Sequence, residues 1–210
     1  MLSIVSFVLG PVQTNSYLIA DEESGEAAVI DPAWDGKRIV AEANKNNWRI
    51  ENIWITHAHF DHVGGTAELI DYVDRPLPIA LHQDDYDLWN VQGGAQLFGV
   101  RLDPMPEPTT KLYHGQILKI GALHLEVRHA PGHTKGHVMF YCESEAVLFC
   151  GDVIFQGGIG RTDLPGGDYQ TLIDSIYNQV LSLPDETRLL SGHGPESTVG
   201  IEKKYNPFLG

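Results

Sequence analysis

Short apolar runs separated by turn residues dominate the first half of the chain, a pattern that predicts short strands with helices between them. One helix is expected over Lys37–Lys45, because Ile39, Val40 and Ala43 share one helical face and Asp35 stands where an N-cap would be. The other expected elements of this half are short strands at Ser3–Val8, Ser16–Ala20, Ala27–Ile30, Ile53–Ile55 and Ile79–Leu81, and short helices at Ala67–Val73 and Asp84–Trp89.

A segment rich in Gly and Pro, Gly93–Thr110, separates the two halves and predicts a long functional or mobile loop. In the second half, apolar residues recur at helical spacing over Tyr169–Leu183, behind a capping Asp168. The remaining expected elements are strands at Gln116–Ile120, Leu123–His129, Val138–Cys142, Ala146–Cys150 and Arg188–Leu190, and a last turn at Glu202–Tyr205. Strands with helices interspersed in both halves predict sheets covered by helices within one domain, residues 1–210.

Charge and composition exclude several classes of protein. Fourteen basic residues stand against 28 acidic ones, and a net charge of −14 argues against a nucleic-acid or anionic membrane surface. No apolar run approaches the length of about 18 residues that a membrane span needs. Two cysteines, Cys142 and Cys150, are too few for a disulfide scaffold and are expected to be small buried residues. The opening residues make a poor signal peptide, so a cytoplasmic protein is expected.

Four potential metal ligands fall within six residues directly after the strand Ile53–Ile55, in the sequence His57-Ala58-His59-Phe60-Asp61-His62. His57 and His59 are two residues apart, so an extended backbone can point both at one metal. Asp61 and His62 lie beyond a bend and can reach a second metal. This cluster predicts a metal site.

Three further strands each end in a ligand-type residue beside a glycine: His133 follows Leu123–His129, Asp152 follows the strand ending at Cys150, and His193 follows Arg188–Leu190. Strand ends are where α/β proteins build sites, because the sheet fixes the position and glycine permits close approach. Together with the first cluster this makes five histidines and two aspartates, enough for two zinc-like ions that share a bridging carboxylate. Imidazole and carboxylate suit zinc, iron or manganese.

The H-x-H-x-D-H motif followed by a later His, Asp and His resembles the signature of the metallo-β-lactamase superfamily. The resemblance covers nearly the whole chain and implies an αββα four-layer sandwich with the metals at one sheet edge. It implies that the first metal is held by His57, His59 and His133, the second by Asp61, His62 and His193, and that Asp152 bridges them. It further implies that Asp31, which ends an early strand, orients the ligands.

Within the superfamily the chain is similar to the short bacterial branch of glyoxalase II-like hydroxyacylglutathione hydrolases, without their C-terminal helical domain. The motifs that carry this similarity are Gly10-Pro11, Thr14–Tyr17, Pro131–Thr134, Gly151–Phe155, Gly160–Asp163 and the tail from Gly192-His193-Gly194-Pro195 to Asn206-Pro207-Phe208. Arg161 stands where the longer enzymes carry a glutathione-contacting lysine, and could bind a substrate carboxylate. Arg161 could equally form an ion pair with Asp163, which replaces a tyrosine of the longer enzymes.

These features predict a hydrolase in which a metal-bridging hydroxide attacks a small anionic thioester, with Asp61 and Asp152 as catalytic metal-binding residues. The expected cofactors are two divalent metals, zinc first, with iron or manganese as alternatives. A rival hypothesis is a persulfide dioxygenase that holds a single Fe(II) with His57, His133 and Asp152. Hydrolysis of another ester or a lactone is a second rival, and a non-enzymatic metal-binding module a third. The sequence predicts no particular oligomeric state.

Overall fold

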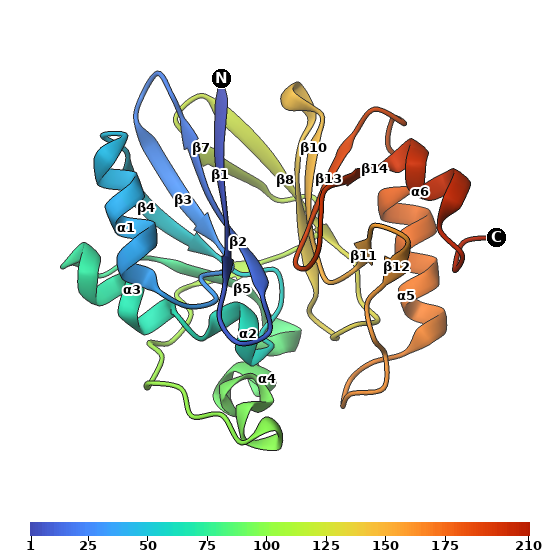
Figure 1. The fold of residues 1–210 in the computed structure, drawn as a ribbon, viewed down its shortest axis with the longest axis horizontal. Helices are drawn as coiled ribbons and strands as arrows, with labels where there is room; N and C mark the ends of the chain where they lie inside the picture. The colour runs from blue at the N-terminus through green and yellow to red at the C-terminus, as the bar shows by residue number, and fades with distance from the viewer. The chain divides into compact units, whose positions relative to one another are not determined.

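The computed structural model describes all residues, 1–210. The chain forms two compact units, one built from Met1–Leu112 with Lys119–Leu123, the other from Tyr113–Leu118 with His124–Gly210. The colour gradient of Figure 1 runs from the first unit in blue and green to the second in yellow and red. None of the helices has the length and apolar character needed to cross a membrane.

The first unit contains a six-stranded sheet in the order β1-β2-β3-β4-β5-β6. Its strands are β1 (Leu2–Leu9), β2 (Thr14–Asp21), β3 (Glu26–Ile30), β4 (Arg49–Trp54), β5 (Ile79–His82) and β6 (Thr110–Leu112). Pairing is antiparallel from β1 to β3 and parallel from β3 to β6. Parallel neighbours need crossover connections, and each of the three crossovers here contains helical segments.

Helices α1 (Gly36–Lys45) and α3 (Thr66–Val73) cover one face of this sheet (Figure 1). Their apolar residues, among them Ile39 and Leu69, join the core formed with the strands, because amphipathic helices bury one stripe. Asp35 does not cap α1: its backbone is left-handed (φ 51°) and its side chain makes no cap hydrogen bond. The carboxylate of Glu68 instead accepts from the Gly36 amide at 3.0 Å.

Shorter helical segments complete the first unit: α2 (Phe60–Val63), η1 (Gln83–Asp85), α4 (Tyr86–Asn90) and η2 (Gln92–Phe98). The predicted loop Gly93–Thr110 therefore begins inside the 3₁₀ segment η2 and ends at strand β6, which the sequence pattern does not predict. At three residues, β6 is too short to show an alternating pattern.

The second unit contains a sheet in the order β14-β13-β10-β9-β8-β7 and a separate two-stranded sheet, β11-β12. The strands are β7 (Ile117–Ile120), β8 (Leu123–His129), β9 (Val138–Cys142), β10 (Val147–Gly151), β11 (Ile154–Phe155), β12 (Gly158–Ile159), β13 (Arg188–Ser191) and β14 (Ser197–Thr198). The 3₁₀ turn η3 (Glu143–Glu145) joins β9 to β10. The strands predicted for this half are confirmed to within one residue at their ends, whereas β4 in the first unit begins four residues before the predicted Ile53–Ile55.

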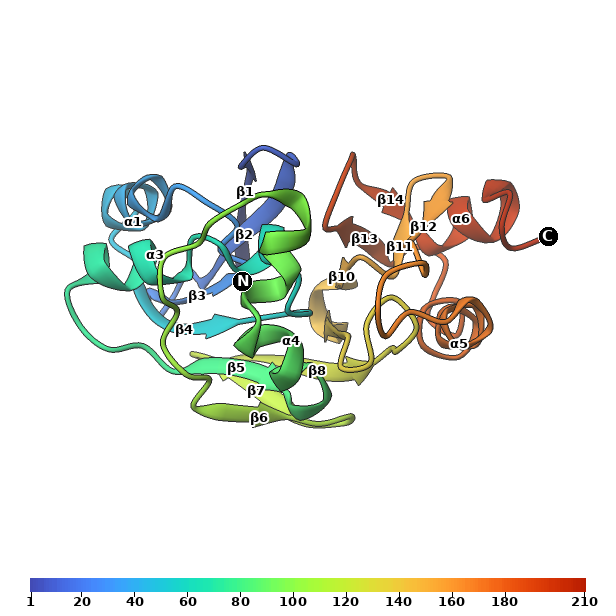
Figure 2. The ribbon, with the colours of Figure 1, turned by 90° about the horizontal axis from the view of Figure 1, so that it is seen from below.

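Helices α5 (Tyr169–Ser175) and α6 (Val199–Tyr205) pack on the core of the second unit. Asp168 caps α5 as predicted, since its Oδ1 accepts from the Thr171 amide at 2.8 Å. The predicted helix Tyr169–Leu183 changes to a π-helix over Ile176–Val180 and stops there. Figure 2 shows the β11–β12 hairpin beside α6.

Candidate metal centre

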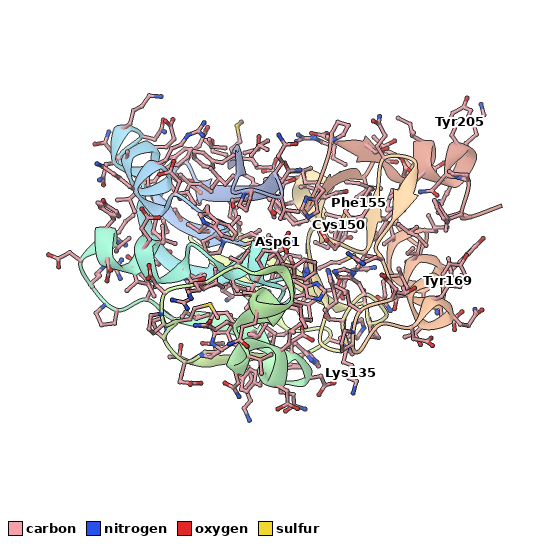
Figure 3. All side chains as sticks on the ribbon, turned by 60° about the horizontal axis from the view of Figure 1, so that its bottom comes forward. Asp61, Lys135, Cys150, Phe155, Tyr169 and Tyr205 are labelled. Atoms are coloured by element: carbon pink, nitrogen blue, oxygen red, sulfur yellow. The ribbon has the colours of Figure 1, made fainter.

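The first group of candidate ligands lies just after β4 and continues into α2. His57 and His62 are fully buried, with ring centroids 4.1 Å apart, and the His57 and His59 rings are 4.9 Å apart. Asp61, labelled in Figure 3, lies on α2, with its Oδ2 3.5 Å from His62 Nε2. The first unit thus gathers all four residues of the H-x-H-x-D-H motif.

Asp31 orients two of these histidines. Its buried carboxylate accepts from the Thr56 amide at 2.7 Å, the Thr56 hydroxyl at 2.6 Å and His62 Nδ1 at 2.9 Å. Because the Thr56 hydroxyl donates to Asp31, it can only accept from His57 Nδ1, which lies 3.0 Å away. Both imidazoles therefore carry their proton on Nδ1 and present Nε2 as a lone pair, the form that ligates a metal.

Three further residues support this group of ligands. Thr14 Oγ1, on β2, donates to Asp61 Oδ2 at 2.9 Å and fixes that carboxylate. Asp85, almost fully buried, accepts from the amide of Ala58 at 3.0 Å. Gly93 has φ 64°, and a Cβ there would lie 2.2 Å from the Phe60 amide nitrogen, so only glycine fits against this segment.

The second group lies in the other unit, where His133, Asp152 and His193 follow β8, β10 and β13. Asp152 Oδ2 is 3.6 Å from His133 Nε2 and 3.5 Å from His193 Nε2. His133 Nδ1 hydrogen-bonds the Arg161 carbonyl at 2.8 Å, so it carries the proton and Nε2 faces Asp152. The Asp152 amide donates to His137 Nε2 at 3.0 Å, which makes His137 a support of this group.

The donor sets of both units fit divalent metals. The three carboxylate–imidazole separations of 3.5, 3.6 and 3.5 Å exceed ordinary hydrogen-bond lengths. Ligands bound at about 2.0–2.1 Å to a tetrahedral ion lie about 3.3–3.4 Å from each other, close to these separations. Imidazole nitrogens and carboxylate oxygens are donors that suit zinc, iron or manganese.

Arg161 has a partner in the second unit. Its Nε and one terminal nitrogen each donate to a different oxygen of Asp163, both at 2.7 Å, and both side chains are exposed. The guanidinium beside it lowers the pKa of Asp163 to about 2, so the carboxylate is ionised at neutral pH. The ion pair, one of the two hypotheses from the sequence, is present; binding of a substrate carboxylate by Arg161 stays a prediction.

The two cysteines have no role in either group of ligands. Cys142 and Cys150 are both free and buried, as predicted. Burial raises the pKa of the Cys150 thiol, so its reactive thiolate form is suppressed.

Comparison with known proteins identifies the family and the fold. The family described as the metallo-beta-lactamase superfamily matches residues 9–193. The hydroxyacylglutathione hydrolase GloC of Haemophilus influenzae is 38% identical over 198 residues, covering 94% of this chain and 93% of that protein. The crystal structure of the BLEG-1 B3 metallo-beta-lactamase has a TM-score of 0.90 at 38% identity, covering 100% of this chain and 99% of that one. TTHA1623, solved in a di-iron-bound form, has a TM-score of 0.88 at 39% identity, covering 98% and 100%.

Proposed function

Because the chain belongs to the metallo-beta-lactamase superfamily, whose fold it shares, we propose that it is a metal-dependent hydrolase of small anionic thioesters, of the hydroxyacylglutathione kind. The observation that carries the substrate class is the 38% identity to GloC across 94% of the chain. The His and Asp donor sets support the metallohydrolase itself.

The proposed ligand assignment follows the order of the motif. His57, His59 and His133 would hold one divalent metal. Asp61, His62 and His193 would hold the second, and Asp152 would be the ligand common to both. Zinc fits the donors, and the di-iron form of TTHA1623 supports iron as the alternative.

The side chains around the ligands set their protonation and orientation. When bound, a pair of such metals lowers the pKa of a shared water towards neutrality and polarises a carbonyl. Asp31 and Thr56 keep the Nε2 atoms of His62 and His57 free of protons, and Thr14 holds the carboxylate of Asp61 in one orientation. We assign to Asp61 the roles of binding metal and of orienting the attacking water, which its fixed carboxylate supports.

A thioester suits a site with no dedicated general acid. A thiol leaving group has a pKa of about 8.5, so it departs as a thiolate near neutral pH with little help from a proton donor. The sequence carries no G-x-S-x-G motif, and Cys150 is buried with a raised pKa, so neither supplies a protein nucleophile. We assign the role of anion recognition to Arg161, which would exchange Asp163 for a substrate carboxylate.

The test compares metal-loaded and chelator-stripped protein with S-lactoylglutathione as substrate. We expect turnover of S-lactoylglutathione to be lost when the chelator removes the metal and to be restored by added zinc or iron. Equal rates in the two samples would refute metal dependence. The Asp152→Ala variant should lose tight metal binding and activity together, and retention of two tightly bound metals would refute the bridging assignment.

Parallel assays separate the rival activities. Oxygen uptake with glutathione persulfide, together with one iron per chain, would indicate the dioxygenase. Hydrolysis of a chromogenic β-lactam faster than the thioester would indicate a lactamase, the activity named for BLEG-1. Thioester turnover without oxygen uptake supports the proposed hydrolase.

A further inference from the structure

The β11–β12 hairpin is connected to all three ligand candidates of the second unit, to His193 by a ring contact and to Asp152 and His133 through the residues that flank it. Asp152 lies two residues before the hairpin, and Arg161, whose carbonyl hydrogen-bonds His133, lies two residues after it. The ring of Phe155 on β11, labelled in Figure 3, meets the His193 ring edge-on, with centroids 6.0 Å apart. A displacement of this hairpin would therefore move the supports of His133, Asp152 and His193 together.

The segments that flank the hairpin pack closely against the backbone next to the ligand candidates. A Cβ on Gly160 would lie 1.9 Å from the Asp152 carbonyl oxygen, so β12 leaves the hairpin directly against the backbone of Asp152. On the other side, Ser191 Oγ, two residues before His193, donates to the Ile154 carbonyl at 2.6 Å. These contacts transmit the position of the hairpin to the ligands on both sides.

The turn of the hairpin is held by a buried polar cluster from the end of the chain. Glu202 on α6 is 1% exposed, and its Oε2 accepts from the Gly157 amide at 2.9 Å and from Asn206 Nδ2 at 2.9 Å. Asn206, which is 5% exposed, also donates from Nδ2 to the Gly158 carbonyl at 3.0 Å. The hydroxyl of Ser197 donates to the other Glu202 oxygen, Oε1.

We propose that Glu202 and Asn206 are positioning residues for the metal centre, acting through the β11–β12 hairpin on His133, Asp152 and His193. Burying a carboxylate lowers the free energy of unfolding unless hydrogen-bond donors surround it. The donors to Glu202 Oε2 are the amide of Gly157, in the hairpin turn, and the side chain of Asn206, which also binds that turn. The inference rests on the proposed metal centre. It gives the Glu202…Asn206-Pro207 segment a role in holding the hairpin turn, in addition to forming α6.

Two isosteric substitutions have opposite expected effects. Glu202→Gln keeps an acceptor oxygen for Gly157 and Asn206 and turns its amide towards Ser197, whose hydroxyl can accept as well as donate. Asn206→Asp instead places a carboxylate against Glu202 Oε2 and the Gly158 carbonyl, so three acceptors meet without a proton between them. The hairpin should stay fixed in the first variant and be released in the second.

The experiment measures zinc affinity by chelator competition, and hydrogen exchange of peptides covering residues 154–161 in metal-free protein. Asn206→Asp should raise the dissociation constant for zinc about 10- to 100-fold, the usual effect of losing support for a ligand, and accelerate exchange in the hairpin. Glu202→Gln should stay within about threefold of wild type. Val180→Ala, which removes buried methyl groups from the core of the same unit, controls for general destabilisation and should leave zinc affinity unchanged.

Wild-type affinity and exchange in folded Asn206→Asp would overturn the inference, as would an equal loss of zinc affinity in Val180→Ala. If Asn206→Asp does not fold, Asn206→Ala takes its place, with the same expected direction and the same refuting outcome. If wild-type protein binds no metal, the proposed function fails. Unchanged hairpin exchange in metal-free Asn206→Asp refutes the positioning role on its own.

Discussion

Replacing Asp31 by Asn tests the protonation pattern on which metal binding depends. The carboxylate of Asp31 accepts three hydrogen bonds, from the Thr56 amide, the Thr56 hydroxyl and His62 Nδ1. An asparagine can keep its oxygen on the Thr56 amide only by turning its NH₂ group towards the hydroxyl and the imidazole. His62 must then accept at Nδ1 and carry its proton on Nε2, where a metal would bind.

The size of the effect follows from the bonds that are lost. A hydrogen bond to a charged acceptor contributes about 1.5–3 kcal/mol, which corresponds to about 10- to 150-fold in an equilibrium constant. Loss of one such bond at His62 should therefore weaken zinc binding by about 10- to 100-fold, the usual cost of removing the group that orients a metal ligand. The free energy of unfolding should fall as well, because the site is buried.

Chelator competition with zinc is the assay, and the chain offers a matched control. Asp74 is also an aspartate in the left-handed region (φ 58°, against 50° for Asp31), but it is exposed at the end of α3. Asp74→Asn should keep wild-type zinc affinity. Unchanged affinity in Asp31→Asn would refute the deduced protonation of His62, and equal losses in both variants would show that the effect is not local.

Two further predictions concern the surroundings of the site. Gly93→Ala should lower the melting temperature and reduce metal binding, because its Cβ would lie 2.2 Å from the Phe60 amide nitrogen. The control Gly99→Ala has a similar φ of 68° but no atom within 4 Å, so it should lower the free energy of unfolding by only about 1 kcal/mol. Equal melting curves for the two variants would contradict the steric explanation. Asp163→Ala should free Arg161 and lower KM for an anionic thioester with little change in kcat. Because the pKa of Asp163 is about 2, the Arg161–Asp163 ion pair of the wild type is present at any pH well above 2. An unchanged or higher KM of the variant across pH 6–8 would show that Arg161 does not bind the substrate.

The sequence pattern predicts strands well where burial imposes an apolar run. β8 and β9 match their predicted bounds, and the ligand candidates His133, Asp152 and His193 do follow strand ends. The two- and three-residue strands β6, β11, β12 and β14 are missed, because so few residues carry no periodicity. The π-helical end of the predicted helix Tyr169–Leu183 is missed because its apolar spacing continues unchanged.

Capping and support depend on backbone geometry that residue type alone does not specify. Asp168 and Asp35 look alike as N-caps, yet Asp168 is extended and caps while Asp35 is left-handed and does not. The roles of Thr56 and Glu202 depend on contacts 25 and 45 residues away along the chain, with Asp31 and Gly157. No local motif marks such pairs.

The most direct test of the proposed function is S-lactoylglutathione turnover measured alongside metal content on one preparation purified without added metal. The account predicts two divalent metals per chain and thioester hydrolysis that disappears on chelation and returns with metal. Hydrolysis at the same rate in metal-free protein, or a fully metal-loaded protein with no thioester turnover, would contradict it.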